Sequence, residues 1–85
     1  MTLVEALAVA KGIGSLLSNS TITSACDVIS DSGSTQLQKE TACNVLVTEN
    51  NNTVISTGYK WPFYNSVTVI HDTVNPNGPV PDRPM

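Results

Sequence analysis

Residues 41–60 read TACNVLVTENNNTVISTGYK, and this stretch decides the fold that the sequence predicts. Two segments rich in β-branched residues, 41–49 and 53–60, flank three consecutive asparagines. β-Branched residues favour strands, and asparagine tolerates the left-handed backbone conformation that tight hairpin turns require. The pattern therefore predicts an antiparallel hairpin that turns at residues 50–52. Its cross-strand pairs would be Val47 with Ile55, Val45 with Thr57 and Cys43 with Tyr59.

The flanking sequence extends this hairpin into a small sheet. Residues 21–29 and 65–74 are also rich in Thr, Val and Ile, so each segment predicts a further strand. Between the strands, Pro62 breaks the pattern because proline cannot donate a ladder hydrogen bond. The expected fold class is therefore α+β, with one helix packed on a β-rich antiparallel meander. The meander would comprise three to four strands, at about 21–29, 41–49, 53–60 and 65–74.

The N-terminal segment, residues 2–18, predicts that one helix. Its apolar residues recur every three to four positions, and Thr2 followed by Glu5 is the pattern of a capping box. Two glycines weaken an isolated helix here, so the helix needs tertiary or partner contacts. Its small residues either pack in the core or form a ridge against another subunit. On the second interpretation the contact residues are Leu3, Ala6, Ala10 and Gly14.

The C-terminal segment, residues 75–85, differs in composition from the domain formed by residues 1–74. It contains four prolines and one glycine in eleven residues, which predicts a stiff, extended arm. Proline lacks an amide donor, so the arm should lie along a partner's surface rather than join its own sheet. Val80 and Met85 are the side chains expected to bury apolar area in that contact.

The composition excludes several classes of protein. The chain has 85 residues, a net charge of -3 and only 13% charged residues, while Ser, Thr and Asn make up 27 positions. Its four cations are scattered, which argues against a basic nucleic-acid binder. No apolar run approaches the roughly 20 residues of a membrane span. A surface poor in charge suits a subunit that other subunits cover.

Two cysteines, Cys26 and Cys43, are the only sulfhydryl groups. With one histidine they fall short of the four ligands of a structural zinc site, so neither a metal nor a cofactor is expected. Residues 24–29 and 41–46 resemble each other, and as neighbouring strands they would place the two thiols opposite one another. One intramolecular disulfide is one interpretation, and two buried free thiols are the other.

Catalytic chemistry has little support in the sequence. His71 is the only histidine, and in a strand its neighbour Asp72 would point to the opposite face. Neither a nucleophile elbow nor a phosphate-binding loop is present. The sequence therefore predicts a protein that is not an enzyme.

All aromatic residues lie within residues 59–64. They either seal the end of the core or form a contact hot spot, because aromatic anchors dominate interface energetics. The hot-spot interpretation assigns partner contact to Tyr59, Trp61, Phe63 and Tyr64.

The first seven residues, MTLVEAL, resemble the mature N-terminus of type IV pilins and pseudopilins. In that family a Phe or Met residue precedes Thr-Leu-Ile/Val-Glu, and the glutamate serves assembly. The resemblance gives that role to Glu5, and it implies that the chain is a processed form. Beyond this segment, Lys11, Gly12 and Ser15 interrupt the apolar helix that the family has.

These observations favour a non-enzymatic structural subunit of a larger oligomeric assembly. The expected assembly is a virion or phage particle, in which the chain would be a minor capsid, decoration or tail protein. One alternative is a pilin-like subunit of a filament at the bacterial surface. The other is a small freestanding binding or inhibitor module that uses the aromatic cluster at residues 59–64.

Overall fold

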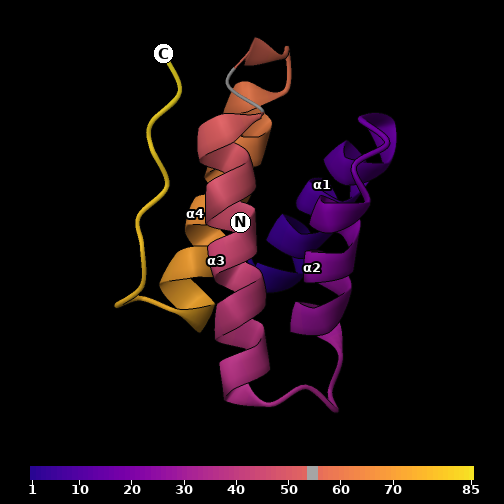
Figure 1. Cartoon of the computed structure of the whole chain (residues 1–85), viewed down its shortest axis with the longest axis vertical. Helices are drawn as coiled ribbons and strands as arrows, with labels where there is room; N and C mark the ends of the chain where they lie inside the picture. The colour runs from indigo at the N-terminus through magenta and orange to yellow at the C-terminus, as the bar shows by residue number, and fades with distance from the viewer. Residues whose placement is uncertain (54–55) are drawn as a thin grey trace.

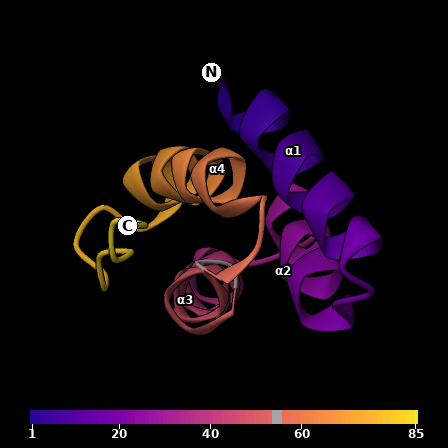
Figure 2. The same ribbon diagram turned by 90° about the horizontal axis from the view of Figure 1, so that it is seen from above.

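A computed structural model describes residues 1–53 and 56–85, which contain four helices. These are α1 (Leu3–Leu16), α2 (Ser20–Ser30), α3 (Gln36–Asn52) and α4 (Lys60–Val74). After α4 the chain turns back along the bundle (Figure 1). Each helix packs on the next, and α1 also packs on α4, so the helices form a closed ring (Figure 2). None of the described helices combines the length and apolarity that a membrane crossing requires.

The α+β prediction is wrong, because residues 1–53 and 56–85 contain no strand. The segments expected as strands at 21–29, 41–49 and 65–74 lie within α2, α3 and α4. In the segment at 53–60, Thr53 caps α3 and Lys60 begins α4, while Val54 and Ile55 lie outside the described residues. The fold is therefore all-helical, and the expectation of a β-rich chain is also wrong.

Helical spacing of the buried residues explains why these Thr- and Val-rich segments are helices. Residues three to four positions apart share one helix face, and a buried stripe at this spacing is stabilised by packing. Packing of such a stripe outweighs the weak strand preference of β-branched residues. The stripes are Ile22, Ala25, Cys26 and Ile29 in α2; Ala42, Cys43, Leu46, Val47 and Asn50 in α3; and Phe63, Ser66, Val67, Ile70, His71 and Val74 in α4.

Side-chain caps fix where α2 and α3 begin. The side-chain oxygen of Asn19 accepts hydrogen bonds from the backbone N–H groups of Thr21 and Ile22, at 3.0 and 3.3 Å. At the start of α3, Thr35 and Gln38 form a reciprocal capping box. Such caps satisfy backbone donors that lack partners in the first turn.

The two expected chain breaks have other roles. Asn50–Asn52 is the last turn of α3 rather than a hairpin turn. Pro62 is the third residue of α4, where its missing N–H costs little because first-turn donors have no partner within the helix. The sequence features that suggested interruption thus mark one helix end and one helix start.

The N-terminal helix packs closely on α2. α1 begins with the capping box of Thr2 and Glu5, and its small residues Ala6, Ala10 and Gly14 are buried. A Cβ atom added to Gly14 would lie 2.8 Å from Cγ2 of Ile22, closer than real Cβ contacts. Gly14 therefore permits the close approach of the two helices.

Candidate interaction surfaces

A groove of about 970 Å³ runs between α2 and α3. Its floor is apolar, and small hydroxyl side chains, including Ser24 and Thr41, line its sides. Leu37 lines it from the first turn of α3 with 74% of its surface exposed. The floor residues are Ala25, Val28, Ala42 and Val45.

The chemistry of this groove suits an apolar partner. Small side chains let a second backbone approach closely, and an amphipathic helix laid in such a groove buries its apolar face. Of the described residues that line the groove, Asp31 alone carries a charge. Little charge would therefore need to be desolvated when a partner binds.

The sequence carried a signal for this groove that the strand prediction missed. Thr21, Ser24 and Val28 recur at helical spacing on α2, and Gln38, Thr41 and Val45 do so on α3. In strands these residues would be divided between opposite faces, so no common surface is visible. The helical period is what brings them together.

The C-terminal arm docks on its own chain. Asn50 Nδ2 donates to the main-chain carbonyl of Asp82 at 3.0 Å, and the Asp82 N–H donates to Asn51 Oδ1 at 2.6 Å. Pro81 and Pro84 are buried, whereas Val80 and Met85 are 72% and 92% exposed. In this single chain the arm lies on its own bundle and leaves Val80 and Met85 largely exposed, so the prediction that these two side chains contact a partner stays a prediction.

Asn50 is under-satisfied where it holds the arm. Its side chain is 1% exposed, and its Oδ1 atom has no hydrogen-bond partner among the described residues. The contact of the Asn50 side chain with the arm is therefore made by Nδ2, which donates to the Asp82 carbonyl.

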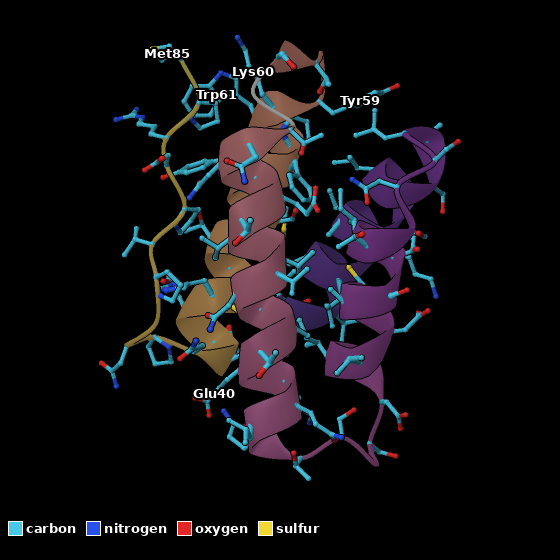
Figure 3. All side chains as sticks on the ribbon, in the orientation of Figure 1. Glu40, Tyr59, Lys60, Trp61 and Met85 are labelled. Carbon is cyan, nitrogen blue, oxygen red and sulfur yellow. The ribbon has the colours of Figure 1, made fainter. Side chains whose placement is uncertain are left out.

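The aromatic residues of the 59–64 segment divide between the core and the surface. Phe63 is fully buried, whereas Trp61 is 41% exposed and packs edge-on against Tyr64, with ring centroids 5.8 Å apart. The guanidinium carbon of Arg83 lies 5.7 Å from the Trp61 ring centre, which is cation–π range. Figure 3 shows Trp61 and Lys60 beside the end of the arm at Met85, with Tyr59 at the same end of the bundle and Glu40 toward the other.

Three of the other proposed contact residues of α1 are buried in the monomer, and the assembly role predicted for Glu5 stays a prediction. Ala6, Ala10 and Gly14 are buried within their own fold, so the small-residue ridge is closed to another subunit. Leu3 is half-buried against the core. Glu5 accepts a hydrogen bond from the Thr2 N–H at 2.9 Å, and this bond lowers the pKa of its carboxyl group.

Cys26 and Cys43 are free thiols, and both are buried. They lie on α2 and α3, so the hairpin that would have placed them opposite one another does not exist. Burial, with a smaller contribution from Asp27, raises the pKa of Cys26 from 9.0 to about 11. Burial and the charge of Asp72 raise the pKa of Cys43 to about 11 as well. Both thiols therefore stay protonated near neutral pH and are poor nucleophiles.

The only histidine joins α4 to the arm. Nδ1 of His71 lies 3.1 Å from Asp72 Oδ1, so the expectation that Asp72 points away from the ring is wrong. Helical geometry, unlike a strand, lets these neighbours meet. Nε2 lies 3.2 Å from the Gly78 carbonyl oxygen, so both ring nitrogens have partners. The imidazole is buried, and both of its nitrogens contact groups of its own chain.

Residues 1–53 and 56–85 contain no group of three or more His, Cys, Asp or Glu side chains that could hold a metal ion. Comparisons with protein-family models, curated proteins and solved structures found no match. The protein is therefore described by its own structure. It is a small four-helix protein with an apolar groove between α2 and α3 and a proline-rich arm docked on itself.

Proposed function

We propose that this chain is a non-enzymatic structural subunit that joins a larger assembly by binding an apolar helix of a partner in the α2–α3 groove. The observation that carries this proposal is Leu37, which lies 74% exposed beside a floor of alanine and valine. Full burial of a leucine side chain contributes about 1.5–3 kcal/mol, so Leu37 would act as an anchor.

The composition supports an assembly as the context of this binding. Only 13% of the residues are charged, and a surface of this kind is easily covered by neighbouring subunits. A virion or phage particle is the assembly that we propose first, and a bacterial surface filament is the alternative. Presence of the chain at fixed stoichiometry in purified particles, or in purified filaments, distinguishes the two.

The freestanding binding module is a second candidate, and the exposure of Trp61 favours it. On that proposal Trp61 and Arg83 would contact the ligand, and the groove would not. The two candidates therefore predict sensitivity to substitutions at different ends of the molecule.

A matched pair of substitutions on α3 tests the groove. Thr41 and Thr48 are both exposed, and each hydroxyl donates to the carbonyl four residues earlier, at 2.9 and 3.0 Å. Thr41 lines the groove and Thr48 does not. We expect Thr41→Tyr to fill the groove and to lower recovery of the native partner at least tenfold in quantitative affinity capture from the source cells.

Thr48→Tyr is the control, and it should leave partner recovery unchanged because Thr48 lies on α3 outside the groove. Thermal unfolding of both variants verifies that the fold is intact. If Thr41→Tyr retains every partner at the level of the unsubstituted chain, the groove does not bind them and the proposal fails.

A further inference from the structure

The arm is held by a site that recognises an extended, proline-containing segment. The buried residues Pro81 and Pro84 are three positions apart, while Asp82 and Arg83 between them are exposed. A polyproline II segment repeats every three residues, so this spacing places both rings on one face. The arm thus presents a proline face to its own bundle.

The bundle recognises the arm mainly through its main chain. Asn50 and Asn51 pair with the carbonyl and the N–H of Asp82. Lys60 Nζ donates to the main-chain oxygen of Met85, and Trp61 packs against Arg83. These contacts come from α3 and α4, and each of them joins the bundle to residues 82–85.

The segment between α4 and the docked residues is a turn that can act as a hinge. The Gly78 N–H donates to the Asn75 carbonyl at 3.0 Å, and the Asn75 side chain donates to Asn44 Oδ1 at 2.8 Å. Opening this turn would release residues 79–85 without altering a helix, and it would also break the contact between His71 Nε2 and the Gly78 carbonyl oxygen.

We propose that this site also accepts the arm of a second copy of the chain, so that two copies exchange residues 79–85. A second copy carries the one sequence that the structure shows seated on the site, and its arm would bind Asn50, Asn51 and Trp61 in the same way. Exchange of an identical element costs little, since the hydrogen bonds and packing broken within each chain form again between the two chains. This site lies apart from the α2–α3 groove.

A labelled peptide with the sequence of residues 76–85, PNGPVPDRPM, tests the site in the 85-residue chain. The arm in the same chain competes with the peptide, so we compare the unsubstituted chain with an 85-residue variant carrying Pro81→Ala and Pro84→Ala. The variant should bind the peptide at least tenfold more tightly, as measured by fluorescence anisotropy. Trp61, the only tryptophan, gives a second readout through its emission.

Two controls assign the binding to this site. A peptide with alanine in place of the residues corresponding to Pro81 and Pro84 should not bind. Adding Asn51→Ala to the double proline variant should abolish binding of the native peptide, with circular dichroism confirming that the helices remain. Thr41→Tyr should leave peptide binding unchanged, which separates this site from the groove.

Exchange itself is tested by the mass of the unsubstituted chain in solution. Light scattering across rising concentrations should show dimers or larger species, and an excess of the native peptide should return them to monomers. A chain that stays monomeric up to millimolar concentration overturns the exchange. Equal binding of the native and alanine-substituted peptides overturns the proline-recognising site.

Discussion

Ser18 occupies a backbone conformation that usually requires glycine. Its φ angle is +54°, and it follows the last turn of α1. The Asn19 N–H donates to the Gly14 carbonyl at 2.8 Å, and the Ser18 N–H donates to the Ser15 carbonyl at 3.1 Å. This pair of bonds is a Schellman motif, in which a left-handed residue ends a helix. A side chain at that position strains the backbone.

We predict that Ser18→Gly stabilises the protein by about 0.5–1 kcal/mol. Glycine removes the cost of the left-handed conformation, and part of that gain is offset by its greater freedom in the unfolded chain. Urea unfolding followed by circular dichroism measures the change. Ser15→Gly is the control, because Ser15 lies within α1 and the same substitution there should destabilise by about 0.5 kcal/mol. Destabilisation by Ser18→Gly would contradict the assigned strain.

At the level of whole elements, the sequence predicted the first helix and missed the other three. In α1 the apolar period and the Thr2–Glu5 capping box agree, and both are present in the structure. In α2 and α3, the abundance of Thr, Val and Ile favoured strands, although Asn19 and the Thr35–Gln38 pair already marked helix starts. Packing of the buried, helically spaced residues stabilises these segments as helices by more than the strand propensity of their Thr, Val and Ile residues opposes it.

The candidate surfaces were harder to predict than the helices. The aromatic segment was visible in the sequence, but its division into a buried Phe63 and an exposed Trp61 depends on the helical turn of α4. The groove forms between two adjacent helices, and it could not be predicted because both segments were expected to be strands of a sheet. The proline-rich arm was recognised as extended, whereas its docking depends on Asn50 and Asn51, which were expected to form a turn.

The packing of α1 on α2 gives a prediction at the scale of the element. Gly14→Ala places a methyl group against Ile22 and should destabilise the protein by about 1–3 kcal/mol. Gly12→Ala is the matched control in the same helix, since a Cβ atom there meets nothing within 4 Å. The control should stabilise by up to about 1 kcal/mol through helix propensity. Thermal and urea unfolding measure both, and equal effects of the two substitutions would contradict close packing at Gly14.

At the scale of the whole molecule, one apolar core joins all four helices, and it holds both thiols. Cys26 and Cys43 have pKa values of about 11 in the folded chain, against 9.0 ordinarily. Above pH 9 the unfolded chain therefore loses thiol protons that the folded chain keeps. The raised thiol pKa values therefore make a contribution to the free energy of unfolding that is fully present below pH 9. This contribution is lost as the pH rises toward 11.

We predict that raising the pH from 8 to 10.5 lowers the free energy of unfolding by roughly 2 kcal/mol for each thiol. Urea unfolding under reducing conditions at a series of pH values measures this slope. The variant Cys26→Ala/Cys43→Ala is the control, because it keeps every other group that titrates in this range. Its stability should fall less steeply with pH, and parallel curves for the two proteins would refute the effect.

The packing of α1 on α4 bears on the order in which the chain folds. The other three helix pairs join neighbours in sequence, so forming them closes short loops. Bringing α1 to α4 closes a loop that contains α2 and α3, and the entropy cost of closure grows with loop length. We expect this contact to form late, after the hairpins of neighbouring helices. Weakening it should then speed unfolding far more than it slows folding, so we expect the α1–α4 contact to govern the lifetime of the native state.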